Sequence, residues 1–256
     1  MSETPGTPSS RPRLTKSETT LYWQLIQTGR ADLVVDLTRQ HLARNPLNST
    51  AQLYLAEALV KLNRIPEALE AAEGAVALAP EWCATHFILA RARWENGHSL
   101  TANEPLAEAL RLDPLRAYYH GWQAQLFFFQ KRYPEAVAAA DTGLRLDPQH
   151  ADVLLWRAEA NEALRRPHLA DQDYRRLFDV SPNYALAHHN RGISLLRRFL
   201  PAAASEHLAE ALRIEPERAP ELTRLLNLAW RWQNWPRWLA GHRAKYQASL
   251  AANPEG

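Results

Sequence analysis

Three histidines, His86, His120 and His188, are the residues of this chain whose type and spacing could form a metal site. They lie 34 and 68 residues apart, so they share one place in a repeating unit. A zinc ion needs its ligand nitrogens about 2.1 Å from one centre. Equivalent atoms of neighbouring packed helices lie about 8–10 Å apart. We therefore expect these histidines to be packing residues, and the sequence predicts no metal site.

Other catalytic patterns are absent from the sequence. It contains no glycine-rich phosphate loop, no nucleophile elbow and no His-Glu-x-x-His segment. Cys83 is the only cysteine, so no disulfide or cysteine-pair redox centre can form within the chain. We expect no catalytic residues, no cofactor and no enzymatic activity.

Arginine pairs occur at residues 165–166, 175–176 and 197–198, close to acidic residues such as Glu162, Asp171 and Asp173. Mixed charges of this kind are typical of a solvated helix face. An acidic partner or nucleic acid is the alternative interpretation of these pairs.

The elements that position these residues are set by a repeat of 34 residues. Prolines keep this step without insertion or deletion, at Pro46, Pro80, Pro114, Pro148, Pro182 and Pro216. Small residues follow it in other columns, such as Ala56, Ala90, Ala124, Ala158 and Gly192, and Ala68, Ala102, Ala136, Ala170 and Ala204. A fixed period of this length predicts a solenoid whose units stack on their neighbours.

Each repeat is predicted to form two helices. In one repeat, Leu55 and Leu59 belong to a first apolar stripe, and Ala68, Ala72 and Ala75 to a second, at spacings of three or four residues. Turns separate the helices, and Gly29, Gly97 and Asn63 are suited to the positive φ that such turns need. Pro105 lies inside an expected second helix, so that helix should either start late, capped by Asn103, or bend.

The period and the residues within each window resemble the tetratricopeptide repeat family over roughly Thr15 to Leu250. The resemblance implies an all-α fold, a right-handed superhelical α-solenoid of about seven helical hairpins. Its expected range is 15–250, with divergent end units at 15–46 and 217–250. We expect disordered tails at residues 1–14 and 251–256, because these segments lack apolar runs.

In this family the exposed face of each first helix lines a concave groove that binds a peptide. The corresponding places form a strip of aromatic, apolar and charged side chains. The implied groove residues are Tyr54, Phe87, Arg91, Trp94, Tyr118, Trp122, Gln125, Phe128, Phe129, Trp156 and Glu159. A known variant of the groove binds chaperone tails through lysines, asparagines and an arginine. At the corresponding groove places this chain carries other residue types, and only Asn190 resembles the pattern.

The last unit carries four tryptophans within nine residues, Trp230, Trp232, Trp235 and Trp238. Terminal repeats of solenoids need an atypical outer face, so a capping cluster is one interpretation. A second interface is the other, since exposed tryptophan is a frequent anchor of interfaces.

Composition limits the partners. With 30 basic and 28 acidic residues the net charge is only +2, which gives no electrostatic reason to expect nucleic acid. The sequence has no apolar run long enough for a membrane span and no signal peptide, so we expect a cytoplasmic protein without membrane contact. The chain contains many more arginines than lysines, which indicates a GC-rich coding genome, and we expect a bacterial source.

We therefore expect a non-enzymatic scaffold or adaptor that binds an apolar or amphipathic segment of a partner protein. A regulatory subunit of a separately encoded enzyme is an alternative. A helical-repeat RNA binder of the pentatricopeptide type is a further one, although it would need a basic face with polar base-reading residues.

Overall fold

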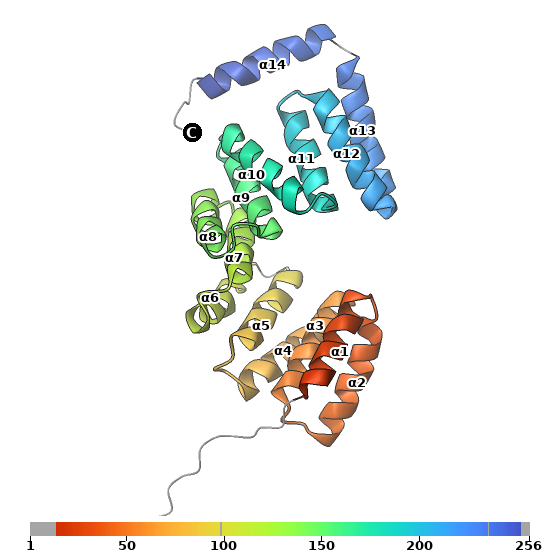
Figure 1. Cartoon of the computed structure of the whole chain (residues 1–256), viewed down its shortest axis with the longest axis vertical. Helices are drawn as coiled ribbons and strands as arrows, with labels where there is room; N and C mark the ends of the chain where they lie inside the picture. The colour runs from red at the N-terminus through yellow and green to blue at the C-terminus, as the bar shows by residue number, and fades with distance from the viewer. Residues whose placement is uncertain (1–13, 98, 235, 252–256) are drawn as a thin grey trace, which may run out of the picture. The chain divides into compact units, whose positions relative to one another are not determined.

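The computed structural model describes residues 14–97, 99–234 and 236–251, apart from the side chains of 236–239 and 250. Every regular element in these ranges is helical, which confirms the all-α prediction (Figure 1). The helices run over Lys16–Gln27 (α1), Ala31–Arg44 (α2), Ser49–Lys61 (α3), Ile65–Leu78 (α4), Cys83–Glu95 (α5), Asn103–Leu112 (α6), Ala117–Phe129 (α7), Tyr133–Leu146 (α8), Ala151–Ala163 (α9), Pro167–Val180 (α10), Ala185–Arg197 (α11), Pro201–Ile214 (α12), Ala219–Gln233 (α13) and Pro236–Ala251 (α14), with a 3₁₀ turn at Pro216–Arg218.

The chain divides into two compact units, Met1–Tyr119 and His120–Gly256, and α7 begins in the first and continues into the second. Within each unit, consecutive helices pair as hairpins and each hairpin packs on the next. In the first unit α3 pairs with α4 and α5 with α6, and α4 also packs on α5. In the second, α9 pairs with α10 and α11 with α12. This nearest-neighbour packing is the expected arrangement of a helical-hairpin solenoid.

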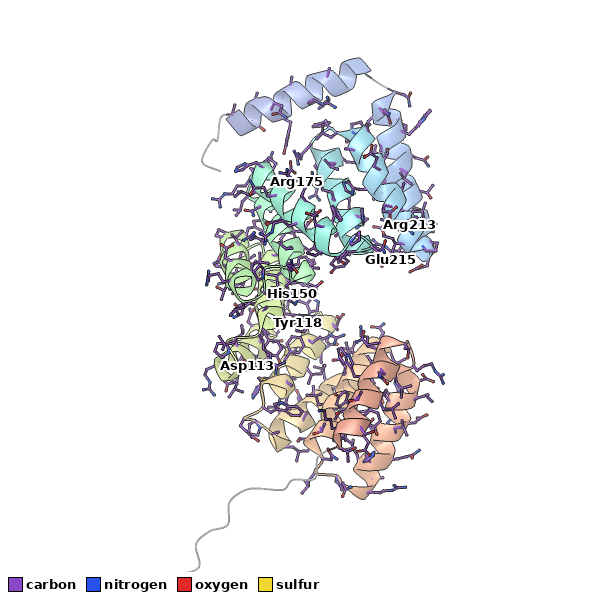
Figure 2. The ribbon with its side chains drawn as sticks, in the orientation of Figure 1. Asp113, Tyr118, His150, Arg175, Arg213 and Glu215 are labelled. Atoms are coloured by element: carbon purple, nitrogen blue, oxygen red, sulfur yellow. The ribbon has the colours of Figure 1, made fainter. Side chains whose placement is uncertain are left out.

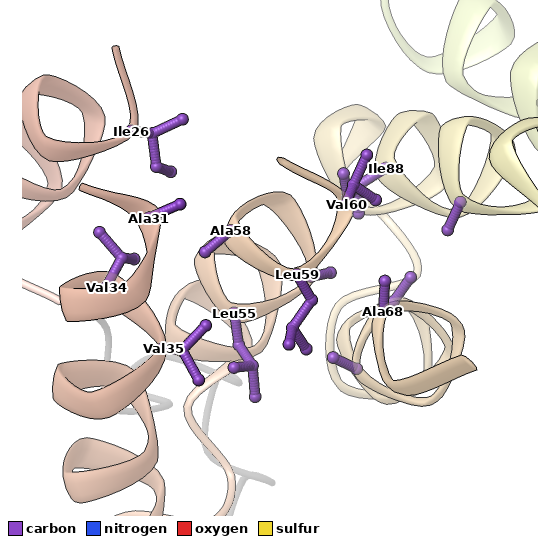
Figure 3. Close-up of a cluster of buried hydrophobic side chains, with 14 of the residues drawn as sticks. Ile26, Ala31, Val34, Val35, Leu55, Ala58, Leu59, Val60, Ala68 and Ile88 are labelled. Atoms are coloured by element: carbon purple, nitrogen blue, oxygen red, sulfur yellow. The ribbon is translucent and has the colours of Figure 1, made fainter. Parts of the chain in front are cut away.

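The core of the first unit lies between the helices of neighbouring hairpins. Figure 3 shows Leu55, Ala58 and Leu59 of α3 between Val35 of α2 and Ala68 of α4. The alanine column of the repeat is fully buried here, because a larger side chain would hold the paired helices apart. Burial of these apolar faces supplies the stability that single helices of this length lack in water.

The second unit repeats this packing with the same columns. Ala124, Ala136, Ala158, Ala170 and Ala204 have no exposed surface. Gly192 occupies the small-residue place on α11, and a Cβ there would lie 2.6 Å from Leu208 Cγ. The small-residue columns therefore set how closely paired helices approach each other.

In the six hairpins from α1–α2 to α11–α12, the turn carries a residue with positive φ at the spacing of the repeat. Gly29, Gly97 and Asn63 have φ of 78°, 79° and 57°, as the sequence predicted. The same place holds Lys131, Arg165 and Phe199, with φ of 61°, 61° and 56°. The turn geometry is thus kept even where a residue with a bulky side chain must adopt it.

Prolines lie at helix starts, where a missing N–H costs little. Pro167 and Pro201 are the first residues of α10 and α12. Pro105 has the predicted effect, since α6 starts late, at Asn103. Its N-cap is Ala102 rather than Asn103, and it has no side-chain hydrogen bond at the cap.

The ends of the chain differ from the central hairpins. The predicted tails, residues 1–14 and 251–256, lie outside the described residues except for Leu14, which is buried, and Ala251, which ends α14. Helix α14 leaves the end of α13 and makes few contacts with it (Figure 1). No helix of the described chain is both long and apolar enough to span a membrane.

Candidate partner-binding surfaces

In the first unit, the predicted groove residues form an aromatic cluster at the start of α5 and α7. The ring of Phe87 is stacked on Tyr119 with 4.7 Å between centroids, and it lies 5.2 Å from Tyr118. Phe87 is buried, whereas Tyr118 is exposed over more than a third of its surface. The Tyr119 hydroxyl faces Cys83 Sγ at 3.8 Å, and burial raises the pKa of Tyr119. Tyr118 is therefore the member of this cluster that a partner can cover.

The other predicted aromatic residues of this unit are half-buried. Tyr54 on α3 makes an edge contact with Tyr22 on α1, with 5.8 Å between ring centroids. Burial raises the pKa of the Tyr54 hydroxyl. Trp94, near the end of α5, is also half-buried. Each of these rings keeps only part of its surface for a partner.

Arg91, the predicted charged residue of the first unit, is paired within the chain. Its Nη1 lies 2.5 Å from Glu57 Oε1, and both side chains are largely buried. The two residues are 34 positions apart, so they occupy the same place in neighbouring repeats. An acidic and a basic residue separated by one repeat length, such as Glu57 and Arg91, are a pattern from which this ion pair could have been predicted. The contact holds Arg91 in place and neutralises its charge.

In the second unit, four rings pack together at the junction of α7, α8 and α9. We call Phe128, Phe129, Tyr133 and Trp156 the aromatic floor. Phe128 and Phe129 lie 5.7 and 5.5 Å from Trp156, and Phe128 lies 5.6 Å from Tyr133, between ring centroids. Trp156 is only 7% exposed, whereas Phe129 is 52% exposed. The floor thus has a rigid buried base and one large ring open to solvent.

The aromatic floor lies in a pocket of about 1000 Å³. Helices α7, α9 and α11 line it, and α14 contributes His242, Lys245 and Tyr246. Among the predicted groove residues, the pocket brings together Gln125, Phe128, Phe129, Trp156 and Glu159. Trp122 is half-buried and is not among its lining residues.

Two acidic residues line the pocket, and Glu159 is the predicted one. Burial raises the pKa of the Glu159 carboxyl, although the Tyr174 hydroxyl donates a hydrogen bond to it. Tyr174 is itself fully buried, and burial raises its pKa as well. Burial therefore disfavours the negative charge of Glu159 at the base of the pocket, and the hydrogen bond from Tyr174 offsets this only in part.

The second acidic residue, Glu162, belongs to a network that neutralises it. Ser194 Oγ donates a hydrogen bond to Glu162 Oε1 at 2.5 Å, and Arg191 and Arg198 lie 3.6 and 3.5 Å from the same oxygen. Both arginines also pair with Asp171, at 2.7 and 2.6 Å. Burial alone would raise the pKa of Asp171, but the two guanidinium groups outweigh burial and lower it.

Three cationic side chains of the pocket have no such partner. Arg165, Arg197 and Lys245 line the pocket and are exposed. None of them forms an ion pair with an acidic residue in the described part of the chain. Sequence reasoning missed Lys245, His242 and Tyr246 because no local pattern shows that α14 reaches this pocket.

The C-terminal tryptophans are described in part. Trp230 on α13 is 65% exposed, and Trp232 is stacked on Phe199 with 5.5 Å between ring centroids. Trp235 lies outside the described residues, as does the side chain of Trp238. Trp230 is therefore the one described tryptophan of this group that has the exposure of an interface anchor.

Two of the histidines predicted to pack make hydrogen-bond contacts with a preceding proline. His86 Nε2 lies 2.7 Å from the Pro80 carbonyl oxygen, and His188 Nε2 lies 2.9 Å from that of Pro182. His188 Nδ1 also lies 3.0 Å from His207 Nδ1. Within the described residues, no three His, Cys, Asp or Glu side chains are placed to hold a metal ion.

Comparison with known proteins agrees with the repeat and the helical hairpins. The sequence matches the tetratricopeptide repeat family over residues 36–81, 89–151 and 123–170. No curated protein gives a significant sequence match. Among solved structures, the chain resembles one from the APC/C hetero-tetramer Cut9–Hcn1, with a TM-score of 0.76 and 14% identity over 92% of this chain. This chain spans 46% of the length of that one.

Two further structures show the same fold. One is TTC0263, a thermophilic tetratricopeptide protein of Thermus thermophilus, with a TM-score of 0.61, 22% identity, and coverage of 71% of this chain and 98% of that chain. The other is YrrB, described as a tetratricopeptide protein with an unusual peptide-binding site. It has a TM-score of 0.53, 14% identity, and coverage of 76% of this chain and 97% of that chain. From its 34-residue repeat, its helical hairpins and its family match, the chain belongs to the tetratricopeptide repeat family.

Proposed function

We propose that this chain is a non-enzymatic scaffold or adaptor that binds a segment of a partner protein on the aromatic side chains of its first helices. The observation that carries the proposal is the aromatic floor, which lies in a pocket large enough for several side chains. Regulation of a separately encoded enzyme would be one form of this function. A cytoplasmic location fits Cys83, which is buried and unpaired by any disulfide.

The energetics favour the aromatic floor over charged residues as the main source of affinity. Covering a large exposed ring such as Phe129 contributes about 1.5–3 kcal/mol, and a few buried anchors dominate most interfaces. Exposed ion pairs contribute about 0–1 kcal/mol. The rigid base under Phe129 also limits the entropy lost on binding, because Trp156 and Phe128 already hold the ring in place.

The predicted residues of the first unit support a second contact surface. Tyr118 is the accessible ring there, beside the buried Phe87. Trp94 and Tyr54 add partly exposed rings. In this proposal Arg91 positions its neighbours through its pair with Glu57 rather than acting as a free charge.

Affinity capture with matched variants tests the proposal. A Phe128→Ala/Phe129→Ala double variant tests the second unit, and Trp94→Ala/Tyr118→Ala tests the first. Leu146→Ala, an exposed apolar residue of α8 outside the pocket, is the control. If the two replaced side chains contact the partner, we expect the amount of partner recovered from cells that make this protein to fall about tenfold or more. The circular dichroism spectrum of the variant should be unchanged. Full recovery with both double variants would contradict the proposal.

A further inference from the structure

The pocket of the second unit has an uneven distribution of charge. Its lining includes Arg165, Arg197 and Lys245 as cations, and Glu159 and Glu162 as acids. The cations come from three places, the turn after α9, the last residue of α11, and α14. They are far apart in sequence, so the fold and not a local basic run brings them to one pocket.

The two acids do not balance these cations. Glu162 is already shared between Arg191, Arg198 and the Ser194 hydroxyl. Glu159 accepts a hydrogen bond from Tyr174 and is held in a setting that disfavours its charge. Arg197 and Glu159 form no ion pair, so the positive charge of Arg197 affects the Glu159 carboxyl only by electrostatic attraction at longer range. Three like charges around one pocket repel each other, and a bound anion would relieve this repulsion.

Helix α14 is attached beside the pocket through contacts with Phe199. The Arg243 guanidinium donates to the Phe199 carbonyl oxygen at 3.0 and 3.2 Å, and the His242 ring lies 5.1 Å from the Phe199 ring. Lys245 and Tyr246 then line the pocket itself. Helix α14 thereby places Lys245 at the pocket.

We propose that this pocket binds an acidic peptide segment with an aromatic or large aliphatic side chain, and that Lys245 of α14 is one of its contacts. This inference rests on the proposed function and names the chemistry of its partner. The apolar side chain of the partner packs on Phe129 and its neighbours in the aromatic floor. Its carboxylates pair with Arg197 and Lys245 on either side, and Arg165 adds to the attraction. Sequence alone left an acidic partner of these arginines as one alternative.

Selection from a phage-displayed library of random dodecapeptides on the full chain tests the inference without knowledge of the natural partner. We expect the selected peptides to combine several Asp or Glu residues with an aromatic or large aliphatic residue. The affinity of a synthetic copy, measured by fluorescence anisotropy, should fall as salt increases, because exposed charge pairs are screened. The part of the affinity that comes from the aromatic floor should remain at high salt.

Charge-reversal variants then locate the contact. Arg197→Glu/Lys245→Glu should weaken binding of the selected peptide about tenfold. The neutral double variant Arg197→Gln/Lys245→Gln should weaken binding less than the charge reversal does. It still tests the contact if the charge-reversal variant fails to fold. The matched control is Arg175→Glu. Arg175 is an exposed residue of α10, labelled in Figure 2, and it is not among the residues that line the pocket. Its reversal should leave the affinity for the peptide unchanged.

The outcomes separate this inference from the function on which it rests. If selected peptides carry no excess of acid, or if the Arg197 and Lys245 variants bind them fully, the acidic partner is wrong. The pocket itself still stands in that case provided that Phe128→Ala/Phe129→Ala abolishes binding. Binding that survives both the charge and the ring variants, or a selection without enrichment, would overturn the pocket as the site as well.

Discussion

Arg157 of α9 binds the carboxylate of Asp173 of α10 through two hydrogen bonds, with Nε–Oδ2 and Nη2–Oδ1 distances of 2.9 and 2.6 Å. Asp173 is only 3% exposed. The same guanidinium reaches Asp141 of α8 at 2.7 Å, but that carboxylate is 45% exposed. One arginine therefore joins three successive helices of the second unit, and its two partners differ mainly in burial.

Removing the buried partner should cost far more stability than removing the exposed one. Asp173→Ala leaves the buried part of Arg157 without its bidentate partner and should lower the free energy of unfolding by about 3–5 kcal/mol. Asp141→Ala should lower it by about 0–1 kcal/mol. Urea denaturation of both variants measures the difference. Equal losses would mean that burial does not control the strength of these pairs.

Gly192 should tolerate no side chain. An added Cβ would lie 2.6 and 2.7 Å from two carbons of the fully buried Leu208. Gly192→Ala should therefore destabilise the chain by about 1–3 kcal/mol. Gly241 of α14 has nothing within 4 Å of such a Cβ, so Gly241→Ala should cost nothing and can gain up to about 1 kcal/mol from helix propensity. Thermal melts that rank the two substitutions in the opposite order would contradict the packing described for α11 and α12.

The chain should lose stability in mild acid through His207. Burial, together with the charges of His188 and Arg191, lowers the pKa of His207 from 6.5 to about 4. The His207 ring packs against both His188 and Phe178, with 5.2 and 5.0 Å between ring centroids. Glu210 pairs with Arg213, which Figure 2 labels near the end of α12, and it also interacts electrostatically with His188.

In the unfolded chain His207 is protonated below about pH 6.5, whereas in the folded chain it is protonated only below about pH 4. The unfolded state therefore binds more protons between these values, and the free energy of unfolding decreases as the pH falls from 6.5 to 4. His207→Gln cannot titrate. Its melting temperature should decline less between pH 7 and pH 4.5 than that of the unchanged chain. Parallel declines in the two proteins would show that His207 does not contribute.

Much of the fold could be predicted from the sequence because the determinants of each hairpin repeat at a fixed spacing. The alanine columns, the turn at Asn63 and the late start of α6 at Pro105 all depend on residues close in sequence. The positive φ of Lys131 and Phe199 was not predicted, since neither residue favours that geometry. It becomes expected once their places are aligned with Gly29 and Gly97.

The candidate site was predicted less completely than the fold. Five residues of the groove that the family resemblance implies line one pocket, namely Gln125, Phe128, Phe129, Trp156 and Glu159. The contribution of α14 depends on contacts between segments far apart in the chain, such as Arg243 with Phe199, and no local pattern indicates them. The burial of Trp156 follows from its packing against the rings of α7.

Site-specific photo-crosslinking tests the central claim, that a partner protein binds on the aromatic floor. A benzophenone amino acid replaces Phe129, the exposed ring of the floor, and in control proteins it replaces Val180 of α10 or Trp230 of α13, which do not line the pocket. After irradiation in cells that make this protein, position 129 should yield a crosslinked partner band that position 180 does not. A band that appears only at position 230, or equally at 129 and 180, would contradict the assignment of the binding surface to the aromatic floor.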